Sequence, residues 1–321
     1  MVAFASTADI ANQTARIVEF AEGVYGYVSQ HDPNCGFVVG DEYVVVIDTR
    51  ATPMAARAWI TDIRTVTDKP IRYAFLTHYH AVRAMGASAF GDAAIVASKA
   101  TGALLTERGQ GDFEAEMQRM PRLFEGFEEI PGLTQPHILF DEEVTLRVGR
   151  RHIHLTHIGK GHTAGDSICW IPDCGVLFGG DLIENRTGIY CGDAYIHDWL
   201  DTLERLRAFS PKVLVPGRGA PLTTLQAVSD AVDSHKNFLV TLLRTVQLGL
   251  DRGADLPGCY QLARERITPL YGDWPVYDHI LPFGVARAYD ELRGLKHPQI
   301  WTPERDKALW KTVHPETLAS A

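Results

Sequence analysis

The chain has 321 residues and a formal net charge of −9 at pH 7. Its composition, 45% hydrophobic and 22% charged, is that of a globular protein with a sizeable core. An acidic chain has no general attraction for nucleic acid or for an anionic membrane surface, because both need a basic face. We therefore expect a small-molecule substrate rather than a polyanionic partner, and the oligomeric state, a homo-oligomer included, stays open.

Targeting patterns and cysteine pairs are both absent from the sequence. Residues 1–16 lack a basic start followed by an apolar run, and no window holds about 18 uninterrupted apolar residues. The sequence thus predicts a cytoplasmic protein. The five cysteines are scattered and include no C-x-x-C pair, which argues against a disulfide framework and a cysteine zinc site. Cys169 and Cys174 flank a four-residue turn, so one disulfide there stays open for an oxidising compartment.

The first half of the chain predicts alternating strands and helices. β-branched residues fill 37–39 and 43–48, and the second run ends on Asp48. Helical spacing follows over 54–67, and a short apolar strand follows over 71–76, which is the order of a layered α/β protein. His78 comes directly after that strand, where layered α/β sheets usually place their chemistry.

The second half predicts more strands and then only helices. Residues 101–131, charged and punctuated by glycines, predict a helical insertion that could lie over a site. Strands resume at 144–148, 152–156, 167–171, 176–178 and 213–215, with a helix at 199–209. Residues 225–313 are helical in pattern, broken by Pro257, Pro269, Pro275 and Pro282. We expect a main domain over 1–225, with the insertion at about 101–135, and a helical extension over 226–321 packed on it.

Three predicted strand ends carry side chains that bind metals. His78 and His80 are one residue apart on an extended turn, so both imidazoles can face one ion. His162 lies in the glycine-bounded turn 161–167, and Asp181 follows the strand 176–178. Each motif alone is weak evidence, but their order along the chain is informative.

In that order the motifs resemble those of the metallo-β-lactamase superfamily. The family pattern is a strand that ends on aspartate, then T-H-x-H-x-D-H, G-H-T-x-G-x-S, G-D and P-G-H-G, and the resemblance covers roughly residues 15–225. The matching positions here are Asp48, 77–80, 161–167, 180–181 and 216–219. The resemblance implies a four-layer αββα sandwich with extra C-terminal helices. It also implies a metal on His78, His80 and His162, with Asp181 where the family bridges two metals.

The chain departs from the family at three positions that would hold the second metal. Val82 and Arg83 replace the aspartate and histidine after the histidine pair, and Arg218 replaces the last histidine. A guanidinium is always protonated and cannot bind a metal, so the sequence predicts a mononuclear site with one divalent ion, zinc or iron. Arg83 and Arg218 then either pair with Asp181 alone or bind an anionic group of the substrate, and both alternatives stay open.

Three functions fit these residues. A metal held by three histidines and a carboxylate acidifies water, which indicates a zinc hydrolase of a small anionic ester, lactone or thioester. Val82 replaces the aspartate that usually acts as general base in the family, so proton removal would fall to Asp181, to a nearby side chain or to bulk water. Arg83 or Arg218 would stabilise the oxyanion or bind an anionic group, and the expected catalytic residues are therefore Asp181, Arg83 and Arg218. The alternatives are a mononuclear non-haem iron dioxygenase similar to persulfide dioxygenases, using His78, His162 and Asp181, and a non-catalytic binding protein.

Several other polar residues have expected supporting positions. We expect Asp48 and Asp166 to orient loops or a histidine ligand, and His152 and His154 to lie on a strand face without metal. Residues after the Asp181 loop are expected to line the pocket: Tyr190, Tyr195, His197 and Asp198.

Overall fold

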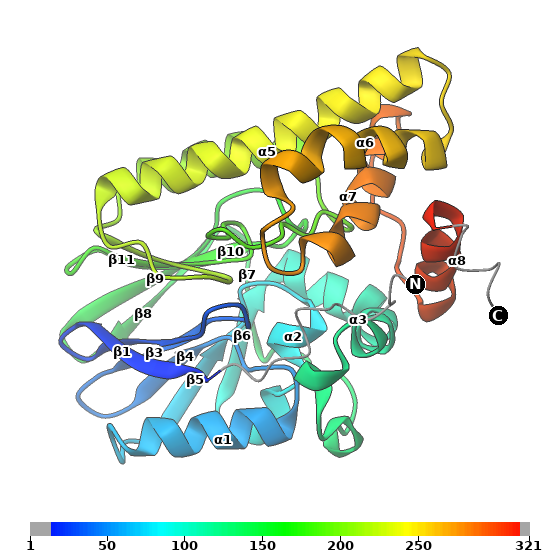
Figure 1. The fold of residues 1–321 in the computed structure, drawn as a ribbon. Coiled ribbons are helices and arrows are strands. Elements are labelled where there is room, and N and C mark those ends of the chain that lie inside the picture. Colours follow the sequence, from blue (N-terminus) through cyan, green and yellow to red (C-terminus); the bar gives the residue numbers. More distant parts are fainter. Residues whose placement is uncertain (1–13, 315–321) are drawn as a thin grey trace.

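The protein is described by a computed structural model over residues 14–314. The expectation that residues 1–16 are not a secretory signal therefore lies mostly outside the described residues. A seven-stranded and a five-stranded sheet face each other, and helices cover the outer face of each (Figure 1). This confirms the four-layer αββα sandwich with extra C-terminal helices. Within the described residues, no helix combines the length and the apolar character that crossing a membrane would need.

The first sheet follows the chain order β1 to β7, antiparallel up to β4 and parallel from β4 onward. Its strands are β1 (Arg16–Ala21), β2 (Val24–Val28), β3 (Cys35–Val39), β4 (Val44–Ile47), β5 (Ile71–Phe75), β6 (Ala94–Ser98) and β7 (Ile138–Phe140). Helix α1 (Pro53–Arg64) makes the β4–β5 crossover. Thr52 caps its first turn by accepting from the Ala55 amide, and Trp59 and Ile63 are buried against the sheet.

The second sheet has the order β12-β11-β10-β9-β8 and is antiparallel except between β11 and β12. Its strands are β8 (Glu143–Val148), β9 (Arg151–His157), β10 (Ser167–Ile171), β11 (Val176–Gly180) and β12 (Val213–Pro216). Apolar side chains of both sheets, such as Val45 and Phe75 from one and Leu155 and Phe178 from the other, form the core between them. Cys169 and Cys174 are free thiols, so the disulfide left open by the sequence does not form.

The segment predicted as an insertion is mostly helical, and that it is an insertion stays a prediction. It consists of α3 (Lys99–Arg119) and two short 3-10 helices, Pro121–Phe124 and Phe127–Glu129. A further 3-10 helix, Ala87–Phe90, and the one-turn helix α2 (Ala81–Ala84) precede it. Several charged residues of α3 are buried, and two of its carboxylates accept from the first amides of α2. The insertion therefore packs directly on the loop that carries His78 and His80.

The remaining helices lie on the outer face of the second sheet or beside it (Figure 1). They are α4 (Ile196–Ala208), α5 (Leu225–Asp251), α6 (Leu256–Tyr271), α7 (Tyr277–Leu292) and α8 (Pro303–Val313). The expected breaks at Pro269 and Pro282 are wrong, because these prolines lie inside α6 and α7. Pro282 is buried, so tertiary packing can offset its lost backbone hydrogen bond, whereas Pro269 is exposed.

Two polar contacts attach the C-terminal helices to the rest of the fold. Glu291 on α7 accepts from the backbone amides of Ile196 (3.1 Å) and His197 (3.0 Å), which are the first residues of α4. Arg119 at the end of α3 forms a buried ion pair with Asp306 on α8, with 3.0 Å between Nε and Oδ2. In Figure 1, α8 lies beside α3.

Candidate metal centre

The four predicted metal-binding side chains meet at one end of the two sheets. His78 and His80 lie between β5 and α2, His162 lies between β9 and β10, and Asp181 follows β11. One ring nitrogen from each histidine lies within 4.8 Å of the others. The histidines are at most 2% exposed and Asp181 is 6% exposed, so all four side chains are buried.

Each imidazole has one nitrogen engaged outside the cluster. His78 Nδ1 is 3.1 Å from Thr77 Oγ1, His80 Nε2 is 3.3 Å from Asp193 Oδ2, and His162 Nδ1 is 2.9 Å from the carbonyl oxygen of Tyr190. These contacts select the ring nitrogens that face inward.

The inward nitrogens converge on one point. His80 Nδ1 and His162 Nε2 are 2.9 Å apart, and His78 Nε2 lies 3.6 Å from Asp181 Oδ2. His78 Nε2 is buried and has no hydrogen-bond partner among the described residues. A buried ring nitrogen costs free energy unless it is satisfied, and three converging imidazoles beside a carboxylate are the donor set of a metal site. The residues present therefore fit a divalent ion.

Electrostatics separate the three histidines. Burial lowers the pKa of His78 well below its ordinary value, and burial followed by the charge of His80 lowers the pKa of His162 to about 3, so both are neutral and able to bind metal. Burial also disfavours charge on His80, but the carboxylates of Asp112 and Asp193 outweigh it and raise its pKa to about 9. Metal binding at His80 must therefore displace a proton.

Asp181 is ionised although it is buried. Burial would raise its pKa, but Arg83 and then His78 hold it far below the ordinary value. Its Oδ2 faces the cluster, 3.7 Å from His162 Nε2, and its Oδ1 accepts from Arg83 Nη2. One oxygen is thus left for a metal while the other is neutralised by the arginine.

Arg83 is completely buried and its terminal nitrogens are engaged by the protein. Nη2 donates to Asp181 and to the Gly217 carbonyl (2.8 Å), and Nη1 donates to the Asn34 carbonyl and to Asp48 Oδ2 (3.3 Å). Its charge lies beside the carboxylate of Asp181.

Arg218 differs from Arg83 in its surroundings. It is 7% exposed, its Nη1 donates to the His31 carbonyl at 3.0 Å, and its Nη2 lies 3.9 Å from the thioether sulfur of Met120. No ion pair within 4.0 Å joins it to any described carboxylate. Its charge still contributes to lowering the pKa of Asp181, which indicates that it lies close to the cluster.

A family model described as the metallo-beta-lactamase superfamily matches residues 29–218, more than half of the chain. The chain belongs to the metallo-beta-lactamase superfamily. It has the hydrolase fold of that superfamily and a histidine and aspartate cluster with the donors for a metal ion, and members of the superfamily usually bind divalent metals.

Curated relatives and solved structures carry the same family name. The metallo-beta-lactamase type 2 of Elizabethkingia meningoseptica is 24% identical over 208 residues, which is 62% of this chain and 75% of the relative. The corresponding protein of Bacillus sp. (strain 170) is 26% identical over 193 residues, 58% and 67% of the two chains. A metallo-beta-lactamase from Pontibacter korlensis has a TM-score of 0.56 at 21% identity, covering 68% of this chain and 97% of that one. The DIM-1 metallo-beta-lactamase has a TM-score of 0.53 at 19% identity, covering 70% and 100%. These two structural likenesses show the fold alone.

Three carboxylates near His80 escaped the sequence analysis. Asp112 and Glu116 come from α3, where they accept from the amides of Ala81 (2.7 Å) and Val82 (3.1 Å). Asp193 lies in the loop before α4 and stays ionised because His80 lowers its pKa against the effect of burial. No motif marks these residues. For Asp112 and Glu116, the signal that could have found them is a helix whose acidic residues recur at a spacing of four; Asp193 lies in a loop and has no such signal.

The supporting residues expected from the sequence divide into two groups. Asp48 accepts from the amide and hydroxyl of Thr77, and Asp166 accepts from the amide of Thr163, so both fix loops that carry histidines. The Tyr190 ring lies 5.6 Å from that of His80.

The side chains of the other group have partners outside the cluster. Tyr195, His197 and Asp198 line a separate surface pocket. His154 binds Glu143 at 2.9 Å on a strand face.

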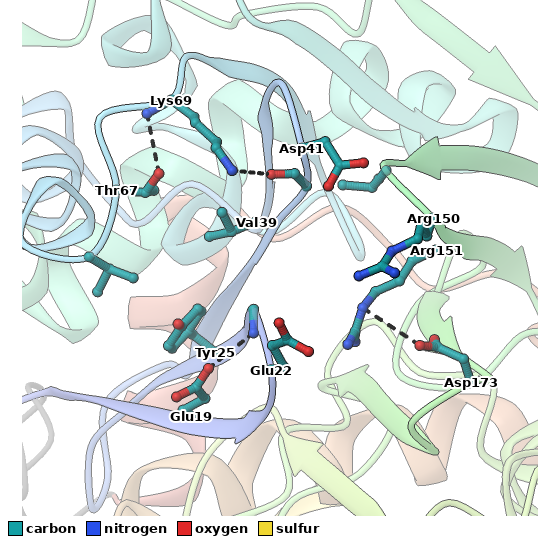
Figure 2. A pocket seen from close by; sticks show the side chains of 14 residues that line it. Glu19, Glu22, Tyr25, Val39, Asp41, Thr67, Lys69, Arg150, Arg151 and Asp173 are labelled. Carbon is teal, nitrogen blue, oxygen red and sulfur yellow. Dashed lines mark hydrogen bonds and ion pairs between the residues drawn. The ribbon is translucent and has the colours of Figure 1, made fainter.

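A surface crevice of about 500 Å³ lies at the turns of the two sheets and is distinct from the histidine cluster (Figure 2). Charged side chains line it, and Lys69 Nζ donates to the Gly40 carbonyl at 2.7 Å while Arg151 lies 3.6 Å from Asp173. None of its lining residues belongs to the histidine cluster, and none is a histidine or a cysteine. Although the crevice is large, its lining residues do not make it a candidate metal centre.

Proposed function

We propose that this chain is a cytoplasmic, mononuclear zinc hydrolase. His78, His80 and His162 would hold the ion, with Asp181 in or next to its coordination sphere. The observation that carries the proposal is the convergence of three inward ring nitrogens, one of them buried without a partner, on one carboxylate. A divalent ion on such donors supplies an acidified water for hydrolysis.

A single ion is supported by the surroundings of Asp181. Its Oδ1 is taken by Arg83, whose guanidinium cannot bind a metal and is held by four acceptors. Val82, where the family has an aspartate, is buried and apolar. The positive charge that a second ion would provide is therefore supplied by the arginine.

The protein's own residues then have distinct tasks. Asp193 and the Tyr190 carbonyl hold His80 and His162 in the ring orientation that leaves a lone pair facing the cluster. Asp181, kept ionised by Arg83, balances the charge of the ion. Arg218 leaves donors for a substrate, and we propose a small anionic ester, lactone or thioester.

The same donors support a second candidate, a mononuclear non-haem iron dioxygenase of the persulfide-dioxygenase type. His78 Nε2 and His162 Nε2 lie 3.6 Å and 3.7 Å from one oxygen of Asp181, so two histidines and a carboxylate could form a facial triad. Elemental analysis of protein purified without added metal separates the candidates. About one zinc per chain supports the proposal, and equimolar iron favours the dioxygenase. Two zinc ions per chain overturn the mononuclear site, and no metal after dialysis favours a binding protein.

Two histidine variants test the assignment of the ligands. His162→Ala should abolish tight zinc binding and the hydrolysis of a panel of esters, lactones and thioesters, because it removes one of three imidazoles. His154→Ala is the matched control, since this histidine binds Glu143 on a strand face. Equal loss of zinc from both variants would contradict the proposed site.

A further inference from the structure

Arg218 is a buried cation without a carboxylate partner. It is 7% exposed, and among the described residues the contacts of its guanidinium are the His31 carbonyl and the sulfur of Met120. A guanidinium has five N–H donors, and a thioether is a weak acceptor. Burying such a group without an anion is costly. The surroundings of Arg218 therefore lack one negatively charged group.

The two nearby carboxyl groups do not supply that charge. Asp181 is engaged by Arg83 on one oxygen and faces the histidines with the other. Burial, and then the neighbouring charge of Asp181, raises the pKa of Glu184 well above its ordinary value, and among the described residues no ion pair within 4.0 Å joins its carboxyl group to the Arg218 guanidinium.

The position of Arg218 is fixed next to the metal centre. Its neighbour Gly217 lies so close to Asp181 that a Cβ there would collide with Asp181 Oδ1. Asn34 holds the same turn. Its backbone amide donates to the Gly217 carbonyl (2.7 Å), and its side-chain Nδ2 donates to the Pro216 carbonyl (3.0 Å). The guanidinium thus projects from a rigid turn that touches the metal-facing carboxylate.

A second polar group near Arg218 is unsatisfied. His31, whose carbonyl accepts from Arg218, has a buried ring nitrogen, Nδ1, with no hydrogen-bond partner among the described residues. A protonated or neutral imidazole can donate to an anion, and a guanidinium binds carboxylate, phosphate or sulfonate oxygens in pairs.

We propose that Arg218, with His31 beside it, is the subsite that binds the oxyanion group of the substrate, a carboxylate, phosphate or sulfonate. This assignment rests on the proposed function, because it places the substrate's reacting bond at the adjacent metal centre. Arg83 has no part in it, since its terminal nitrogens already serve four protein acceptors. The two arginines that replace metal ligands therefore have different roles. Arg83 positions Asp181, and Arg218 binds the substrate.

Calorimetric titration of the full zinc-loaded chain with inorganic phosphate, and separately with acetate, tests the subsite. Arg218→Met should weaken binding at least about 10-fold, and Arg218→Lys, which keeps the charge but loses the paired donors, should lie between it and the parent. Arg207→Met is the control, because this surface arginine pairs with Asp233 and should leave the affinity unchanged. An affinity in Arg218→Met equal to that of the parent overturns the proposal.

Two further arms keep the outcome decisive. If Arg218→Met does not fold, Arg218→Lys and His31→Ala decide, and unchanged phosphate affinity in both overturns the subsite. The titration is repeated on zinc-free protein. If zinc-free protein binds no phosphate, and Arg218→Met leaves the affinity of the zinc-loaded protein unchanged, the anion binds to the metal instead and the proposal is overturned. Zinc content and hydrolysis of the parent are measured separately. A parent without zinc whose phosphate affinity still depends on Arg218 would overturn the proposed function and leave the subsite standing.

Discussion

The carboxylate of Asp193 is the contact that sets the orientation of His80. It also accepts from Tyr190 Oη (3.3 Å) and from Arg108 Nη1 (3.4 Å), so three different segments hold it in place. A carboxylate on the far nitrogen of a ligating histidine fixes the ring and raises its basicity. Asp193 is therefore a positioning residue for the metal centre.

Asp193→Asn should lower zinc affinity about 10- to 100-fold, because the amide neither fixes the tautomer nor carries the charge that favours a basic imidazole. Competition with a chromophoric chelator measures the change. Asp198→Asn is the matched control, since this aspartate is exposed in the first turn of α4. If both variants bind zinc as tightly as the parent, Asp193 has no positioning role.

His235 predicts a specific pH dependence of stability. It is fully buried against Trp199, with ring centroids 4.8 Å apart, and burial followed by the charge of His162 lowers its pKa to about 3. The unfolded chain binds a proton here near pH 6.5 and the folded chain does not, so this contribution to stability is lost as pH falls from about 6.5 toward 3.

Between pH 7 and pH 5 the His235 contribution amounts to about 2 kcal/mol of the free energy of unfolding. His235→Phe keeps an aromatic ring on Trp199 and should lose less stability over that range by about this amount. Urea unfolding at both pH values gives the difference. An identical decrease in parent and variant would contradict the prediction.

The parts of the site that the sequence predicted are those marked by local motifs. His78, His80 and His162 lie in short local motifs, and the order of these motifs along the chain was informative although each motif alone was weak evidence. Asp193 reaches His80 across 113 residues of chain and Asp112 reaches Ala81 across 31, with no motif at either end. The donors of Arg83 are engaged by neighbours such as Asn34, whereas Arg218 lies beside Met120. No sequence pattern predicts that these neighbours lie beside the two arginines. The roles of Arg83 and Arg218 stay predictions.

Among the elements, α3 illustrates why a helix can be predicted and its packing cannot. Its composition is helical, but its buried face is polar and includes Arg108, Asp112, Glu116 and Arg119. Hydrophobic periodicity finds helices that bury apolar stripes. A helix that buries charges depends on partners from other segments. The strands with β-branched runs, by contrast, were predicted correctly because their apolar residues alone explain their burial.

The ion pair between α3 and α8 should be strongly coupled. Arg119 is 1% exposed, lies over the rings of Tyr190 (5.2 Å) and Phe283 (4.8 Å), and pairs with the fully buried Asp306. Asp306→Ala leaves a buried guanidinium unpaired and should cost about 3 to 5 kcal/mol of the free energy of unfolding.

The double variant Arg119→Met, Asp306→Leu should cost clearly less than Asp306→Ala alone, because no unpaired charge is left in the apolar surroundings. Chemical denaturation of the parent, the single variants and the double variant measures the coupling. Additive losses would show that the two residues do not interact as the structure places them.

At the scale of the whole molecule, the C-terminal helices share one core with the sandwich. Leu203 and Leu206 of α4, Leu239 and Leu242 of α5 and Phe283 of α7 belong to a single buried cluster. The helical extension predicted from the sequence is thus packed on the main domain over an apolar face that the domain cannot leave exposed.

A chain ending at residue 224 should therefore fail to fold, although it keeps all four proposed metal-binding residues. Removing α5 to α8 exposes the apolar face of α4 and of the second sheet. Size-exclusion chromatography and circular dichroism should show aggregation or loss of structure. A folded, monomeric product that binds zinc would contradict this prediction.

The Glu291 contact on α4 also bears on when the candidate metal centre can form during synthesis of the chain. The first amides of α4 obtain this acceptor from a residue about 95 positions later in the chain, and the loop that ends at α4 carries Tyr190 and Asp193. While the ribosome is still making α5 and α6, a nascent chain already contains every proposed ligand, yet the segment that orients His80 and His162 has not been anchored. We therefore expect the candidate metal centre to form late, after α7 has emerged and docked. A nascent chain arrested before that point would hold zinc only weakly.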